Sequence, residues 1–213
     1  FHARYDGDDY HLGSTSGSSM LDVSRRNSSL ALQIAPMRPV ARQRVVLTAK
    51  ASGNGQVTGL VNFFVDEKLT GRSNLSQGYA KFTLPMLSVG PHSIYAQYEG
   101  SPYFYGMRSQ TVNISTSPAE PRVSVAADRS KILPGEQVTL TANLTAMAPA
   151  SGTPDGTVTF KDGEKSLATR RLSSGKSTFE TPPLNTGIHD FFVTYSGSSD
   201  FEEAKSPVRT VTV

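Results

Sequence analysis

An internal repeat limits what this chain can fold into more than any other feature of its sequence. From Gly59 onward the sequence aligns without a gap to the segment from Gly156 onward, at a constant offset of 97 residues. Further upstream the offset is 93, and the difference, 97 − 93 = 4, predicts a four-residue insertion within Met147–Asp155. That stretch is rich in Ala, Pro, Ser and Gly, which is typical of a surface loop that tolerates changes in length. Self-similarity at a fixed spacing indicates tandem copies of one folded unit.

The first residues of the chain fit the same spacing. Tyr5, Gly7 and Ser16 stand 93 positions before Tyr98, Gly100 and Ser109. We therefore expect three units: residues 1–26 as the last two strands of a truncated preceding repeat, and complete domains at 27–117 and 118–213. Phe1, Ala3 and Tyr5 would then face a core whose other strands lie elsewhere. Such strands either dock onto the edge of a partner's sheet or lie disordered.

Within each copy the apolar residues alternate with polar ones, which is the period of a half-buried β-strand. Val45, Leu47 and Ala49 point one way, and Val138, Leu140 and Ala142 repeat the pattern. Clusters of Ser, Asn, Asp and Gly punctuate these runs and predict turns. About seven short strands in roughly 95 residues is the count of an immunoglobulin-like sandwich. We predict an all-β chain of tandem immunoglobulin-like β-sandwiches.

The second complete copy resembles the bacterial immunoglobulin-like (Ig-like) repeats of large secreted and surface proteins. The motifs that carry the resemblance are Gly156-Thr-Val-Thr-Phe160-x-Asp162-Gly163, Leu184-x-x-Gly187-x-His189, Tyr195-Ser-Gly197-x-x-x-Phe201 and the closing Thr210-Val-Thr-Val213. In the middle copy Phe64-Val65-Asp66-Glu67 replaces the Asp-Gly turn. The resemblance covers essentially the whole chain and implies the fold, but such repeats occur in adhesins, in stalks and in the non-catalytic parts of secreted enzymes.

Composition narrows the class of protein. The 213 residues contain no cysteine, which excludes disulfides, thiolate catalysis and Cys-based zinc sites and favours a bacterial secreted or surface protein over an animal one. The net charge of +3 is small and scattered, so we expect no nucleic-acid partner. The sequence has no apolar run of about 20 residues, so we expect no insertion into a membrane.

Two histidines, His92 and His189, occupy the same place in the repeat, two residues after a glycine. Ig-like sandwiches have a corner-locking tyrosine near the start of the corresponding strand. A catalytic histidine would need a nucleophile or carboxylate partner in both copies, and the spacing indicates none. We predict a structural hydrogen bond at this corner in each domain.

Asp6, Asp8 and Asp9 form a small acidic cluster in a predicted turn. Calcium prefers several oxygen ligands from such loops, which makes these residues weak candidates for a metal site. The equivalent turns, at Glu99–Pro102 and Ser196–Ser199, hold too few carboxylates, so a solvated turn is the favoured interpretation. We expect neither a metal nor another cofactor.

Tyr103 and Tyr105 flank Phe104, whose counterpart in the other copy is Phe201. Phe104 is therefore predicted in the core. The two tyrosines have no aromatic counterparts, because Asp200 and Glu202 stand in their places. Exposed tyrosines stack on sugars or anchor protein interfaces. We expect either a ligand contact or packing against the neighbouring domain at the linker.

The linkers suggest a role for the whole array. Ser115–Arg122 contains Pro118 and Pro121, which favour an extended, semi-rigid spacer. With no catalytic constellation, we predict a non-catalytic, structural or adhesive module at the cell surface or in the extracellular medium. Its partners would be neighbouring Ig-like repeats and a surface glycan or protein. The alternative is a carbohydrate- or protein-binding accessory module of a secreted hydrolase.

Overall fold

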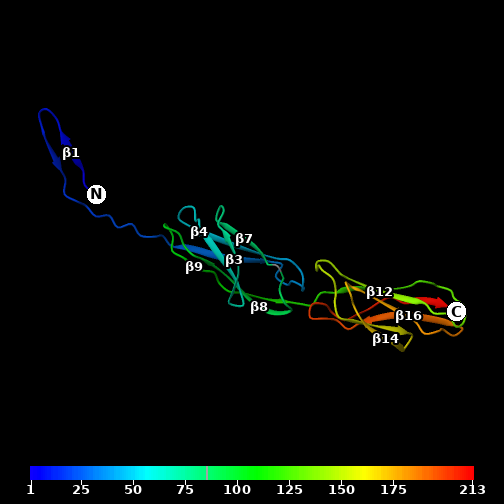
Figure 1. Cartoon of the computed structure of the whole chain (residues 1–213). Helices are drawn as coiled ribbons and strands as arrows, with labels where there is room; N and C mark the ends of the chain where they lie inside the picture. The colour runs from blue at the N-terminus through cyan, green and yellow to red at the C-terminus, as the bar shows by residue number, and fades with distance from the viewer. Residues whose placement is uncertain (85) are drawn as a thin grey trace.

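The computed structural model describes residues 1–84 and 86–213. Its regular secondary structure, over these residues, consists of β-strands alone. The chain forms a two-stranded hairpin followed by two β-sandwiches (Figure 1). The hairpin pairs β1 (Arg4–Gly7) with β2 (Leu12–Thr15). No helical segment in the described ranges is long and apolar enough to span a bilayer.

The first sandwich packs a three-stranded sheet, in the order β3-β4-β7, against a sheet in the order β10-β8-β5-β6, in which β9 also pairs with β8. Because β9 and β10 are successive pieces along the same neighbour, the sandwich has seven strand positions, as predicted. Its strands are β3 (Ser28–Ala35), β4 (Val45–Gly53), β5 (Leu60–Val65), β6 (Lys68–Asn74), β7 (Tyr79–Leu84), β8 (Gly90–Tyr98), β9 (Met107–Arg108) and β10 (Val112–Thr116).

The second sandwich repeats this topology. Its sheets run β11-β12-β15 and β14-β13-β16-β17, with β18 also paired to β16. The strands are β11 (Pro121–Ala127), β12 (Thr139–Ala146), β13 (Thr157–Asp162), β14 (Lys165–Arg171), β15 (Lys176–Glu180), β16 (Ile188–Tyr195), β17 (Ala204–Lys205) and β18 (Arg209–Thr212). The all-β, tandem-sandwich prediction is confirmed.

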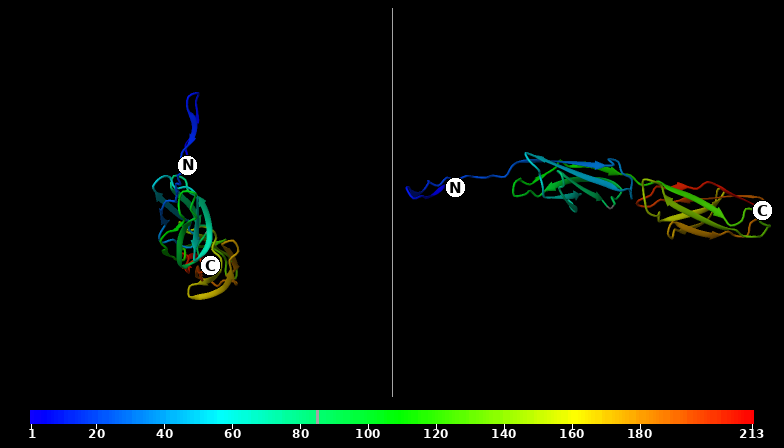
Figure 2. Two further views of the ribbon diagram at one scale, coloured as in Figure 1. Left: turned by 90° about the vertical axis from the view of Figure 1, so that its left-hand side faces the viewer. Right: turned by 90° about the horizontal axis from the view of Figure 1, so that it is seen from above.

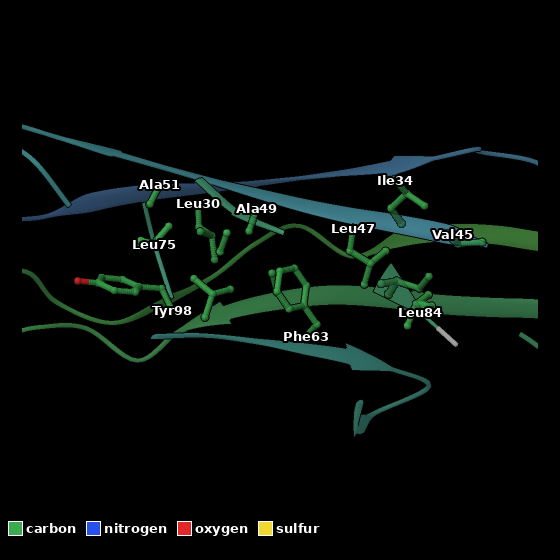
Figure 3. Packing of buried hydrophobic residues seen from close by; sticks show 14 of the residues in the cluster. Leu30, Ile34, Val45, Leu47, Ala49, Ala51, Phe63, Leu75, Leu84 and Tyr98 are labelled. Atoms are coloured by element: carbon green, nitrogen blue, oxygen red, sulfur yellow. The ribbon is translucent and has the colours of Figure 1, made fainter. Parts of the chain in front are cut away.

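Each sandwich has its own core between its two sheets. Along β4 the side chains of Val45, Leu47, Ala49 and Ala51 are buried and alternate with more exposed ones, as the pleat requires. Figure 3 shows these residues facing Phe63 and Tyr98 from the opposite sheet. Phe160 and Tyr195 hold the equivalent places in the second core. Burial of such side chains, at roughly 25 cal/mol per Å² of apolar surface, is what stabilises a sandwich without disulfides.

The repeated glycines Gly59 and Gly156 have a steric explanation. Their φ angles are +129° and +101°, in a region that favours glycine. A Cβ at Gly59 would lie 3.0 Å from the Gly100 carbonyl oxygen, and one at Gly156 would lie 2.9 Å from that of Gly197. Both positions therefore combine a backbone constraint with a close approach.

The N-terminal hairpin has the pairing of the equivalent strands in both sandwiches. Tyr5 pairs with Ser14, Tyr98 with Met107 and Tyr195 with Ala204, each pair being separated by nine residues in sequence. The hydroxyl of Ser16 accepts a hydrogen bond from the Ala3 amide, as those of Ser109 and Ser206 accept from Ala96 and Val193. The side chain of Tyr5 is 46% exposed, whereas Tyr98 is 1% exposed. That residues 1–26 are the end of a repeat stays a prediction, and this register is consistent with it.

The two sandwiches lie end to end, and the hairpin lies beyond the first of them on an extended segment (Figures 1 and 2). In each sandwich the segment after the first strand makes a parallel bridge near the end of the last strand. In the first sandwich Val40 bridges to Ser117, the residue after β10, and in the second Lys131 bridges to Thr212, the last residue of β18. The chain consequently enters each sandwich at one pole and leaves it at the other.

Candidate functional site: the joint between the sandwiches

The linker between the two sandwiches is short and is held in place by backbone hydrogen bonds to a loop of the first sandwich. Ser117 follows β10 directly, and a loop from the first sandwich, Pro39–Arg42, closes over it. The Ala41 amide donates to the Ser117 carbonyl at 2.7 Å, and the Ser117 amide donates to the Pro39 carbonyl at 3.1 Å. Ala41 is fully buried, and Val40 packs against the core of the second sandwich. The loop therefore belongs to one domain and contacts the other.

Arg42 makes the ion pair of this joint. Its Nε lies 2.8 Å from Oδ2 of Asp200, and the two side chains are 27% and 25% exposed. The guanidinium carbon lies 5.6 Å from the centroid of the Phe201 ring, within cation–π range. Arg42 has φ +59°, whereas a glycine, Gly135, stands 93 positions later at φ +88°. A non-glycine residue in this region carries strain, so the side-chain contacts offset a backbone cost.

The predicted insertion completes the joint. Within it, the amide of Ser151 donates to the Arg42 carbonyl at 3.3 Å and its hydroxyl donates to the same oxygen at 3.0 Å. A Cβ on the adjacent Gly152 would lie 2.9 Å from an Arg42 guanidinium nitrogen. The sequence indicated a loop that tolerates changes in length. The structure shows that this loop contacts the preceding domain.

The proline-containing linker is extended, as its composition indicated. Pro118 is half-buried and Pro121 is buried where β11 begins. Ala119, between them, is fully buried and exchanges backbone hydrogen bonds with Asp200 and Glu202 of its own domain. The second domain thus begins two residues after Ser117, which leaves little chain to bend.

His92, at the start of β8, joins two loops of the first sandwich. Its Nδ1 lies 2.7 Å from Oδ2 of Asp66, and its Nε2 lies 2.8 Å from the carbonyl oxygen of Ser88. The other oxygen of Asp66 accepts from the Ser93 amide at 2.8 Å. Burial lowers the pKa of His92, but the bonds to Asp66 and Ser88 outweigh it, so that the pKa lies above 6.5.

His189 makes the same contacts in the second sandwich. Its Nδ1 lies 2.6 Å from Oδ2 of Asp162, and its Nε2 lies 3.1 Å from the Asn185 carbonyl. Burial lowers the pKa of His189 as well, and the bonds to Asp162 and Asn185 again raise it above 6.5 overall. Both ring nitrogens face acceptors, so the imidazolium form, with two N–H donors, satisfies the site.

The group of Asp66, His92 and Ser88 contains the residue types of a hydrolase triad, but its geometry is different. The Ser88 hydroxyl lies 3.4 Å from Nε2, while the Ser88 carbonyl lies closer, at 2.8 Å. A nitrogen that donates to a carbonyl cannot accept a proton from a hydroxyl. The equivalent of Ser88 is Asn185, which has no hydroxyl. The geometry therefore fits a structural corner, and that role stays a prediction.

The acidic residues of the hairpin turn do not converge. Asp8 accepts hydrogen bonds from the Tyr5 hydroxyl at 2.7 Å, the Tyr10 amide at 2.8 Å and the His11 ring at 2.9 Å. These bonds, that of Tyr5 first, lower the pKa of Asp8 to about 2. Asp6 instead pairs with Arg4 at 2.8 Å. Across residues 1–84 and 86–213 the structure has no cluster of three or more His or carboxylate side chains suited to a metal ion, so Asp6, Asp8 and Asp9 do not form one.

We expect Asp8→Ala to open the N-terminal hairpin, because the substitution removes the acceptor for three donors. The measurement is amide hydrogen exchange by NMR, which should become faster from β1 to β2. Asp9→Ala, in the same turn, is the matched control and should leave exchange unchanged. Since the pKa of Asp8 is depressed, the hairpin should also loosen as the pH falls towards 2. Equal exchange in both variants would contradict the role of Asp8.

Tyr103 and Tyr105 lie at the pole of the first sandwich that faces the hairpin. Their side chains are 72% and 49% exposed, whereas Phe104 between them is 3% exposed. Their backbone atoms bind Arg26: its amide donates to the Tyr103 carbonyl at 2.8 Å, and its carbonyl accepts from the Tyr105 amide at 3.0 Å. The prediction that Phe104 is buried holds, and both tyrosines are exposed among the described residues, so their role as a ligand or interdomain contact stays a prediction.

Comparison with known proteins decides the family. The sequence profile of the bacterial Ig-like domain (group 3) family matches residues 32–117 and again residues 125–213. The chain belongs to this family. Its two bacterial Ig-like domains correspond to the two sandwiches, and the resemblance seen in the sequence is confirmed. Among proteins of curated function, none matches the chain significantly.

One of the similar solved structures, that of invasin, supports the fold of these bacterial Ig-like domains. Invasin, a bacterial integrin-binding protein, superposes with a TM-score of 0.59 at 16% identity, over 86% of this chain and 39% of invasin. The Yersinia pseudotuberculosis adhesin InvE gives 0.40 at 19% identity, over 87% of this chain and 59% of InvE. The chain thus spans less than two thirds of either protein. At its identity of 16% the likeness to invasin extends to the fold alone.

Proposed function

We propose that this chain is a non-catalytic structural module, a semi-rigid rod of bacterial Ig-like domains that spaces or displays partner domains outside the cell. The observation that carries the proposal is the joint. Bending between the domains is opposed by the two-residue linker and by the Pro39–Arg42 loop that closes over it. It is also opposed by the partly buried ion pair between Arg42 and Asp200 and by the inserted loop that contributes Ser151. Interfaces within a chain otherwise permit relative domain motion by default.

The surroundings of such a rod are also part of the proposal. The absence of cysteine fits a bacterial protein that folds without disulfides. Invasin, which shares the fold, is a bacterial integrin-binding protein. We propose an extracellular or cell-surface location, with neighbouring Ig-like repeats as the immediate partners.

Small-angle X-ray scattering of the whole chain tests the rod. We expect the pair-distance distribution of an elongated particle, because the two domains lie end to end and the joint opposes folding back (Figure 2). A compact globule, or a broad ensemble of bent conformers, would contradict the proposal. Measurement in high salt is a useful companion, since the ion pair is partly shielded from solvent and should resist screening.

A second role, as a binding module for a glycan or a protein, is favoured by one observation. Tyr103 is 72% exposed at the pole of the first domain, and Tyr105 beside it is 49% exposed. Exposed tyrosines offer a large contact area with a polar hydroxyl group, and they anchor many interfaces. This role is compatible with the rod, because the pole is distant from the joint.

A further inference from the structure

The hairpin-facing pole of the first domain can be compared with the pole of the second domain that forms the joint. In the joint, Arg42 of the preceding domain binds Asp200, lies over Phe201 and contacts Gly152. At the first pole the repeat places Tyr103 and Phe104 at the positions of Asp200 and Phe201, and Gly55 lies beside Arg26 as Gly152 lies beside Arg42. The comparison shows which of the groups that bind Arg42 in the joint have equivalents at the first pole.

The first pole lacks two of the polar groups that hold the domains together in the joint. Tyr103 replaces the carboxylate of Asp200, so an arginine from outside would find no ion-pair partner there. The loop that contributes Ser151 in the joint is four residues shorter here, from the difference 97 − 93 in the repeat offsets. The pole is therefore poorly suited to the kind of docking that the joint shows.

At the first pole the position of the Arg42 guanidinium is occupied by Arg26, a residue of the first domain itself. Arg26 donates from a guanidinium nitrogen to the Asn54 carbonyl at 2.6 Å, and the same nitrogen lies 3.4 Å from where a Cβ on Gly55 would be. Arg42 has this relation to Gly152 in the joint. In the described part of the chain no carboxylate lies within ion-pair distance of Arg26, and its side chain is exposed. The pole thus exposes the Arg26 guanidinium, which is positioned by its bond to the Asn54 carbonyl and has further N–H donors for a ligand.

Beside this cation there is a hollow of about 290 Å³. Arg26, Gly55, Gln56, Tyr103 and Phe104 line it, together with the incoming segment at Val23 and Ser24. The volume lies near the lower end of small-ligand sites. In this lining the Tyr103 ring can pack against an apolar face of a ligand, and the Arg26 guanidinium can bind an anionic group on it. The Gln56 amide can form hydrogen bonds with hydroxyl groups of the same ligand.

We propose that this pole is a binding site for an acidic sugar, with Tyr103 against the sugar ring and Arg26 on its carboxylate. Uronic acids combine a ring with apolar faces, several hydroxyl groups and one carboxylate, which are the features the hollow complements. The proposal deepens the second role above and does not depend on the rod, since scattering tests the rod and ligand titration tests the site.

The experiment is a titration of the ¹⁵N-labelled whole chain with D-glucuronate and D-galacturonate, followed by NMR. D-glucose and D-galactose are the uncharged controls. We expect saturable shifts at Arg26, Gly55, Gln56 and Tyr103 with the uronates, weakened by salt, and much smaller shifts with the neutral sugars. Absence of saturable shifts at this pole would overturn the proposal. Equal shifts with an acetylated glutamate peptide would also overturn it and assign the pole to protein carboxylates.

Variants locate the site. Arg26→Gln and Tyr103→Ala should each weaken uronate binding about tenfold, since each removes one principal contact. Tyr105→Ala is the matched control: it lies beside the hollow, and its bond to Arg26 is made by the backbone. Unchanged melting of all three variants shows that the fold is intact. Equal losses in the control and in Tyr103→Ala would overturn the assignment.

Discussion

His92→Ala should lower the stability of the first domain by about 2 kcal/mol, the size of hydrogen bonds to charged groups. The substitution removes the bridge between the Asp66 and Ser88 loops and leaves Asp66, whose side chain is 51% exposed, to be hydrated. For a domain of this size the loss corresponds to a fall of roughly 10 °C in melting temperature. Calorimetry of the whole chain measures it, and His189→Ala should act in the same way on the second domain.

The same pairs make stability depend on pH. The pKa of each histidine is raised on folding, so its contribution is complete below the unfolded pKa of 6.5 and is lost as the pH rises through the folded pKa. The pKa of Asp66 is lowered, chiefly by the bond from His92, so its contribution is lost as the pH falls below its unfolded value of 3.8. We therefore expect the greatest stability from the Asp66–His92 pair between about pH 4 and 6.5, and a decline on the alkaline side from both histidines.

Each variant carries its own control. His92→Ala should leave the melting transition of the second domain where it is, and His189→Ala should spare the first. The double variant should lose the alkaline decline that we expect of the native chain. Identical pH profiles for the native chain and the double variant would refute the imidazolium corner, and unchanged melting of both single variants would refute the corner altogether.

Arg42→Glu should uncouple the two domains without unfolding either. It replaces the ion pair with Asp200 by two facing carboxylates and removes the cation over Phe201. A loss of about 1–2 kcal/mol lowers the population of the docked arrangement relative to the undocked one by about 5–30-fold. Residual dipolar couplings, measured by NMR, should then require separate alignment tensors for the two domains, whereas the native chain should fit one.

Two further variants identify the cause. Arg42→Gly removes the side chain but suits the φ of +59°, so it separates lost contacts from backbone strain. The double change Arg42→Glu with Asp200→Arg restores opposite charges and should restore a common alignment. If Arg42→Glu still fits a single tensor, the ion pair does not hold the joint.

Much of the fold could be predicted from the repeat. Alternation along Val45–Ala49 predicts the buried face of β4, and the recurrence of Tyr98 as Tyr195 predicts the strand pairing that ends each complete domain. These succeed because strand period and turn chemistry are local properties of the sequence. Equivalent residues in the two complete copies also face equivalent surroundings, which is why Phe104 could be placed in the core from Phe201.

The partners of the histidines could not be predicted in this way. Asp162 precedes the turn, whereas its functional counterpart Asp66 lies within the turn, so the two differ by 96 residues rather than 97. Asp66 has φ +49°, and its carboxylate binds His92 and the Ser93 amide as that of Asp162 binds His189 and the Asp190 amide. The contacts of the joint could not be predicted for another reason. Its contacts join Arg42 to Ser151 and Asp200, and no local pattern signals such distant pairs.

The parallel bridges within each sandwich have a mechanical consequence. A pull on the two ends of the rod would draw the segment at Val40 and the strand end at Ser117 in opposite directions along their length. Two backbone hydrogen bonds join these segments, from the Ala41 amide to the Ser117 carbonyl and from the Ser117 amide to the Pro39 carbonyl, and the pull would strain both together instead of parting them one after another. Resistance to tension is then governed by the rate of forced unfolding rather than by equilibrium stability. The order of the strands thus orients the domains to bear load along the axis of the array.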